Sequence, residues 1–106
     1  TTVEIIKTED KAIYGPAHEK IKGITLAQYP LQLKKEAEKI KEIVMGMTQE
    51  DFAKEFDYYG SQSKAMHLLS VLKWATSYKM QLFLYMKNLG YTHLGTINVW
   101  AGMDPQ

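Results

Sequence analysis

The segment from Ser63 to Gly90 constrains the fold of this chain most, because its apolar residues recur with the period of an α-helix. At 100° per residue, one line of side chains along this helix is aromatic and amphipathic, and a second line about a quarter turn away is aliphatic. The first line is suited to a pocket and the second to a core. We call the first line the aromatic stripe: it comprises His67, Val71, Trp74, Tyr78, Gln81 and Tyr85, and the core line comprises Leu68, Leu72, Ala75, Leu82, Met86 and Leu89.

A second amphipathic helix is predicted from Pro30 to Gly46, because proline fits the first turn of a helix and apolar residues come after it at spacings of three and four. Thr48 and Asp51 have the spacing of a capping box, which predicts a short helix to about Glu55. We expect a loop over Phe56–Gly60, and a cap from Ser61 or Ser63 before the long helix. Two positions are predicted to end that helix: Gly90 as a left-handed cap, and Tyr91, folded back on Met86. The two long helices are expected to pack antiparallel through Leu33, Ile40, Val44 and Met47 against Leu68, Leu72, Leu82 and Met86.

These elements predict an all-α protein with a single domain over residues 1–106. Residues 1–29 are expected to be irregular, since the apolar run of Val3, Ile5 and Ile6 is short and Gly15-Pro16 breaks the chain soon after it. Residues 30–90 form the expected helical core. The remainder, 91–106, is expected to be an extended tail that Ile97, Val99 and Trp100 pin to the helices.

Charge and composition exclude several classes of partner. Thirteen basic and twelve acidic residues leave a net charge of +1 without a block of either sign, so we expect no nucleic-acid partner. The longest apolar run, Met80–Met86, is far shorter than the roughly 20 residues that cross a bilayer, so we expect no membrane association. The chain has no cysteine, which excludes disulfides and thiolate chemistry and favours a cytoplasmic location.

Two motifs carry a family resemblance. They are the Met-Thr-x-Glu-Asp-Phe step at Met47–Phe52 and the run Lys79-Met80-Gln81-Leu82-x-x-Tyr85-x-Lys87-x-Leu89-Gly90. Over roughly Leu31 to Gly90 the chain resembles the C-terminal half of the DinB-like superfamily. The resemblance implies a DinB-like helical bundle of the up-down four-helix type. It also implies the family's divalent metal, held by one histidine of the second helix and two of the fourth, and thiol transferase or hydrolase activity.

The metal-ligand positions implied by the resemblance are altered in this chain. Gln81 keeps the glutamine of the motif and Lys79 its basic residue, but Trp74 and Tyr78 stand where the two histidines of the fourth helix are expected. An indole N–H is only a donor, and a phenol coordinates well only as phenolate, with a reference pKa near 10. We therefore expect no bound metal and no cofactor, and an enzyme of the metal-dependent kind is disfavoured.

His67 is a candidate general base or surviving ligand, although a partly buried structural histidine is the favoured interpretation. Chemistry would require a partner, and the other histidines, His18 and His93, lie in predicted loops at opposite ends of the chain. No His-x-x-x-His or Glu-x-x-His pair is present to bind a metal.

Three functions remain open from the sequence. The first is a DinB-like domain with a degenerate metal site that binds a small molecule or serves as a non-catalytic module. The second is a metal-dependent thiol transferase or hydrolase, and the third is a structural or dimerisation module. Three segments are candidates to cover the aromatic stripe: residues 1–30, N-terminal helices missing from a chain that begins Thr1-Thr2 without an initiator methionine, or a second chain. Of these we expect the second chain, which forms a homodimer and completes four helices. The candidate pocket residues are His67, Trp74, Tyr78, Gln81, Tyr85 and Trp100.

Overall fold

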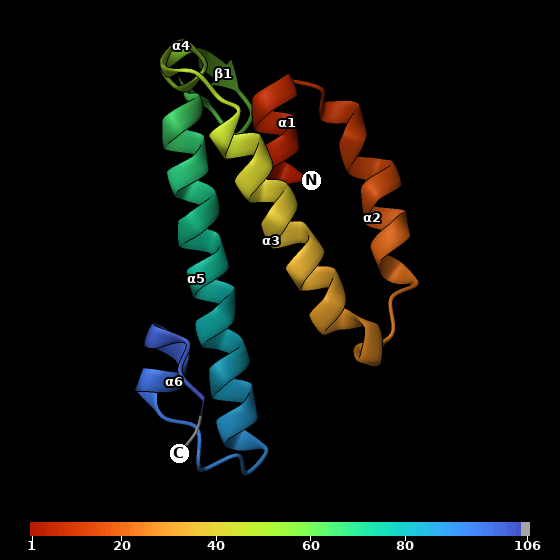
Figure 1. Ribbon diagram of the computed structural model, residues 1–106, viewed down its shortest axis with the longest axis vertical. Helices are drawn as coiled ribbons and strands as arrows, with labels where there is room; N and C mark the ends of the chain where they lie inside the picture. The colour runs from red at the N-terminus through yellow and green to blue at the C-terminus, as the bar shows by residue number, and fades with distance from the viewer. Residues whose placement is uncertain (105–106) are drawn as a thin grey trace. The chain divides into compact units, whose positions relative to one another are not determined.

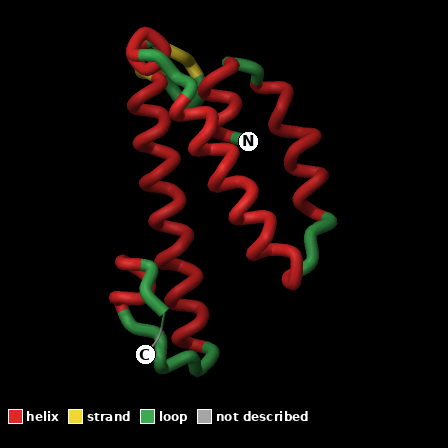
Figure 2. The backbone as a smooth tube through the Cα atoms, viewed as in Figure 1, coloured by secondary structure: helices red, strands yellow, loops and turns green. Residues whose placement is uncertain are grey.

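The computed structural model describes residues 1–104 and is mostly helical, with one short antiparallel hairpin (Figures 1 and 2). The all-α prediction is therefore correct for most of the described chain, and the hairpin is its exception. The chain divides into two compact units, Thr1–Val71 and Leu72–Gln106. One continuous helix, α5 (Lys64–Asn88), contributes its beginning to the first unit and its remainder to the second.

The N-terminal segment is helical, so the prediction that residues 1–29 are irregular is wrong. It contains α1 (Thr2–Thr8) and α2 (Tyr14–Lys22), with single 3₁₀ turns η1 (Lys11–Ile13) before α2 and η2 (Leu26–Gln28) after it. Pro16 lies in the first turn of α2, where the missing N–H of proline has no helical partner to lose. The seven residues of α1 are too few to hold a helix alone, and burial of Val3, Ile5 and Ile6 stabilises it.

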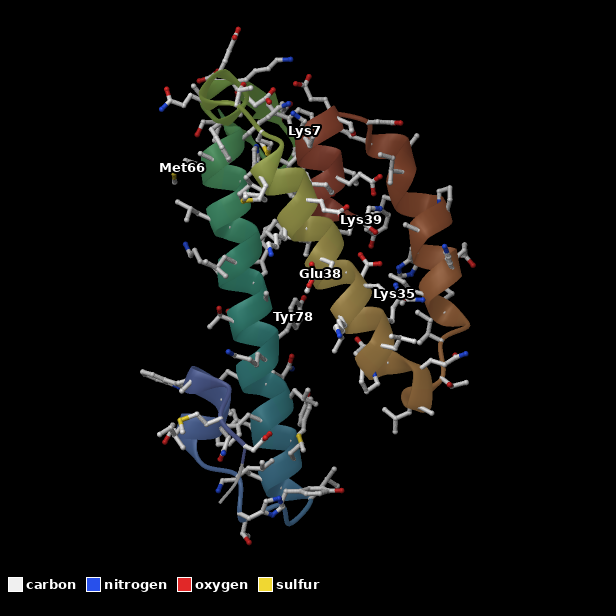
Figure 3. The ribbon with its side chains drawn as sticks, in the orientation of Figure 1. Lys7, Lys35, Glu38, Lys39, Met66 and Tyr78 are labelled. Carbon is white, nitrogen blue, oxygen red and sulfur yellow. The ribbon has the colours of Figure 1, made fainter. Side chains whose placement is uncertain are left out.

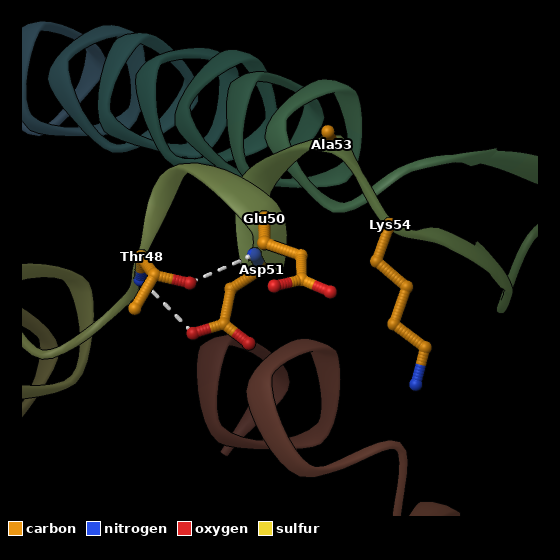
Figure 4. A pocket seen from close by; sticks show the side chains of 5 residues that line it. All are labelled: Thr48, Glu50, Asp51, Ala53 and Lys54. Atoms are coloured by element: carbon orange, nitrogen blue, oxygen red, sulfur yellow. Dashed lines mark hydrogen bonds between the residues drawn. The ribbon is translucent and has the colours of Figure 1, made fainter.

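The two helices predicted next are confirmed. Helix α3 (Tyr29–Met45) has Pro30 in its first turn and is followed by Gly46. Helix α4 (Gln49–Ala53) has the predicted cap: Asp51 N donates to Thr48 Oγ1 at 3.1 Å, and Thr48 N donates to Asp51 Oδ2 at 2.9 Å (Figure 4). Each bond satisfies an amide that the first turn of a helix leaves without a partner.

The segment after α4 forms a hairpin rather than the predicted loop. Strand β1 (Glu55–Asp57) pairs antiparallel with β2 (Ser61–Ser63), with Phe56 opposite Gln62. Gly60, at a φ of 99°, provides the left-handed residue in the connection. Three residues in each strand are too few to show an alternating pattern. Phe56 of β1 is buried with its ring edge-on to His67 of α5, and this contact holds the hairpin on the helix.

Helix α5 begins and ends as predicted. Met66 N donates to Ser63 Oγ at 3.3 Å, which identifies Ser63 as the capping residue. At the other end Gly90 has a φ of 95°, and Tyr91 N donates back to Met86 O at 3.1 Å. The tail is not extended throughout, since α6 (Thr96–Ala101) lies within it; residues 105 and 106 of the predicted tail lie outside the described residues.

The core of the first unit is formed by Val3, Ile5 and Ile6 of α1 together with Met47 and Phe56. The predicted core between the two long helices is wrong at half of its eight positions, since Leu33, Ile40, Leu72 and Leu82 are exposed. Helix α1 packs on α3 instead, and its Val3, Ile5 and Ile6 make up most of the buried apolar side chains (Figure 1). In the second unit, no residue of the described range 72–104 is buried.

Candidate functional site

His67 lies on the first turn of α5 and is buried, with both ring nitrogens in hydrogen bonds. Its Nε2 donates to the backbone carbonyl of Phe56 at 2.7 Å, and Gln62 Nε2 donates to its Nδ1 at 3.0 Å. These partners fit a neutral ring with its proton on Nε2. The Phe56 ring lies edge-on to the imidazole, with the ring centroids 5.9 Å apart. A metal ion would have to displace one of these two hydrogen bonds to reach a lone pair.

The neighbouring Lys64 is also buried, and it connects α5 to the end of α1. Its Nζ donates to Lys7 O at 2.9 Å and lies 2.8 Å from Glu9 Oε1. The Lys7 carbonyl belongs to the last turn of α1, where carbonyls lack helical partners and the helix dipole favours a cation. Lys64 therefore serves as a C-terminal cap for a helix distant in the sequence.

Two carboxylates complete this charged cluster. Glu9, in the left-handed conformation at a φ of 65°, also pairs with Lys54 at 2.6 Å. Hydrogen bonds from Lys54 and then from Lys64 lower the pKa of Glu9. Lys7 Nζ lies 2.7 Å from Asp51 Oδ2, and this bond, with the backbone bond from Thr48, lowers the pKa of Asp51 to about 2. All these charges have close partners, so the cluster holds α1 in place.

Four predicted pocket residues, Trp74, Tyr78, Gln81 and Tyr85, lie together on α5 within the second unit. All are exposed, and Figure 3 shows the Tyr78 side chain projecting from the helix. Gln81 Nε2 donates to Tyr85 Oη at 3.1 Å, one turn further along. The part of the stripe from Trp74 to Tyr85 is thus an exposed, uncharged surface along the helix.

Trp100, the remaining predicted pocket residue of the second unit, lies on α6 and is exposed. The sixth candidate, His67, belongs to the first unit. The structure therefore assigns the six predicted pocket residues to different local surroundings: a buried hydrogen-bonded ring, an exposed helix side and an exposed position on a short helix.

Two of the hollows in the first unit are lined by charged groups, and none of the predicted site residues lines either of these two. A cleft of about 230 Å³ between α1, α2 and α3 is lined by apolar Ile21 and Ile24 and by the ion pair of Lys39 with Glu4, 2.6 Å apart. An open depression over α4 is lined by Thr48, Glu50, Asp51, Ala53 and Lys54 (Figure 4). Most of the polar groups that line this depression form the cap of α4 or ion pairs. None of its lining groups is arranged as a nucleophile beside a base.

Within residues 1–104, no three histidine or carboxylate side chains gather as a metal site would require. No helix in the described part of the chain is both long enough and apolar enough to cross a membrane. Comparisons with protein-family models, curated proteins and solved structures found no match to this chain.

Sequence reasoning missed the role of Lys64. A lysine at the first position of a helix opposes the helix dipole, and this is the one local sign that it has a partner elsewhere in the fold. That partner, the end of α1, was not predicted because α1 itself was not.

Proposed function

We propose that this chain is a non-catalytic helical module of the DinB-like type, in which the stripe on α5 packs against another helical surface. One observation carries the proposal: the second unit exposes Trp74, Tyr78 and Tyr85 along one side of α5 and buries none of its described residues. Exposed apolar patches of this kind are typical of interaction surfaces, and aromatic residues are enriched there.

The state of His67 supports the non-catalytic part of the proposal. By the DinB-like resemblance, Trp74 and Tyr78 occupy the positions of two ligands, and neither side chain supplies a neutral nitrogen lone pair. The remaining candidate, His67, already uses Nε2 and Nδ1 in hydrogen bonds that join the hairpin to α5. A catalytic metal at this stripe would therefore have neither its ligand pair nor a free histidine.

Titration of the purified chain with Zn²⁺ by calorimetry tests this proposal. We expect no one-to-one binding in the micromolar range that depends on His67. His93→Gln is the matched control, since His93 is exposed and accounts for adventitious surface binding. Stoichiometric micromolar binding that His67→Gln abolishes and His93→Gln retains would overturn the proposal in favour of a metal-dependent enzyme.

A further inference from the structure

The stripe continues to Asn88 with the spacing of a coiled-coil seam. From Val71 its members recur at intervals of three and four residues in strict alternation, which is the 3.5-residue period of a heptad. Val71, Tyr78 and Tyr85 occupy one core position of the heptad, and Trp74, Gln81 and Asn88 occupy the other. All six lie within the single helix α5.

From this pattern we infer that the stripe pairs with the same stripe of a second copy of this chain, antiparallel, about a twofold axis between Lys79 and Met80. The inference rests on the proposed function and names its partner. The spacing 3-4-3-4-3 reads the same in both directions. An antiparallel pair centred there places Trp74 opposite Tyr85 of the other copy, Tyr78 opposite its Gln81, and Val71 opposite its Asn88. Such self-complementary pairing is what a twofold dimer requires.

The exposed apolar area matches what a dimer needs. Trp74, Tyr78 and Tyr85 are 43%, 71% and 57% exposed, and at roughly 200 Å² per aromatic side chain they offer about 340 Å². The flanking Leu82 and Leu89, 58% and 77% exposed, add about 140 Å² at roughly 100 Å² each. A standard interface buries about 800 Å² per partner, and roughly 450–520 Å² of that is apolar. The stripe and its flank therefore supply the apolar share of one such interface.

The charge pattern favours a second copy over a charged partner. The charged residues of α5 are lysines alone, and Lys73, Lys79 and Lys87 lie on the sides of the helix away from the stripe. Two stripes therefore meet without bringing like charges together, and a strongly acidic or basic partner has nothing to pair with on the seam. Gln81 is the polar residue near the centre, a position at which polar residues fix register in coiled coils.

Sedimentation equilibrium of the intact chain measures the dimer directly. We expect a dimer with a micromolar Kd, which Tyr85→Glu weakens at least thirtyfold. Leu69→Glu is the matched control: Leu69 is 53% exposed and lies on the opposite side of α5, so we expect a change below threefold. A chain that is monomeric up to hundreds of micromolar, or a dimer that Leu69→Glu weakens as much as Tyr85→Glu, overturns the inference.

Disulfide cross-linking of single-cysteine variants shows whether the two copies of α5 pair parallel or antiparallel, because the chain has no cysteine of its own. An oxidised mixture of Tyr78→Cys and Gln81→Cys chains is expected to yield mainly the mixed disulfide. A parallel pair would instead link Tyr78→Cys chains to one another and would contradict the antiparallel arrangement. Neither a monomeric chain nor a parallel pair would change the expected absence of zinc binding. A wrong dimer can therefore be told apart from a wrong proposed function.

Discussion

The two units of this protein differ in what holds their helices in place, although α5 runs through both. In the first unit, Ile5 and Ile6 are fully buried and Lys64 and His67 are bonded below the surface. In the second unit, no described residue is buried, and α5 exposes aromatic and aliphatic side chains. The comparison shows that a strong helical pattern is sufficient to predict a helix but does not say what the helix packs against.

The charged cluster explains why so short a helix as α1 belongs to the first unit at all. Apolar contacts from three residues hold one side of α1, and Lys64 and Asp51 bind groups near its end. A buried lysine is costly unless its charge is paired, and Glu9 provides that partner. Apolar burial and buried polar bonds therefore both stabilise α1 in the first unit.

The largest effect is a difference in the free energy of unfolding between two alanine substitutions, one in each unit. Ile5→Ala removes a fully buried side chain and should lower the free energy of unfolding by about 3 kcal/mol, because a cavity remains in the core. Leu82→Ala, at an exposed position in the second unit, should lower it by less than about 0.5 kcal/mol in the monomer. Urea unfolding at low protein concentration measures both values, and equal losses would contradict the contrast between the units.

A smaller effect is expected from the charged cluster. Lys64→Met should cost about 2 kcal/mol in the free energy of unfolding, because the Lys7 carbonyl and Glu9 lose a buried donor. Lys54→Met is the control: its side chain is 58% exposed, and we expect it to change stability far less than Lys64→Met, because a solvent-exposed ion pair contributes little. Both variants are compared with the parent chain by urea unfolding. If Lys64→Met were neutral or stabilising, the cap on α1 would have no energetic role.

The smallest effect is expected in the dependence of stability on pH in acid. Asp51 has a folded-state pKa of about 2, below the value of about 3.9 of an unfolded aspartate. Between these pH values the unfolded chain binds more protons, so the stability that Asp51 contributes is present above pH 4 and is lost as the pH falls toward 2. Asp51→Asn should flatten the pH dependence of the unfolding midpoint in that window. An unchanged slope would show that the Lys7 pair does not stabilise the folded state.

Local chemistry made much of the helical framework predictable. The helix starts and ends depend on residues within a few positions of each other, so they can be predicted from short stretches of sequence. Examples are Pro30, the Thr48–Asp51 cap, Ser63 and Gly90. The hairpin and α6 were missed because three paired residues and a six-residue helix carry too little periodicity to be recognised.

For the candidate site, the sequence by itself determined which side chains share one side of α5, because helix geometry fixes that relation once the helix forms. It did not determine their burial. Only the tertiary structure decided that His67 is enclosed by Phe56 and Gln62 while Tyr78 and Tyr85 stay exposed, since burial depends on how the hairpin folds back on α5 and not on the helical pattern itself. The same holds for Lys64, whose partners Lys7 and Glu9 lie more than fifty residues earlier, at a separation that no local pattern encodes.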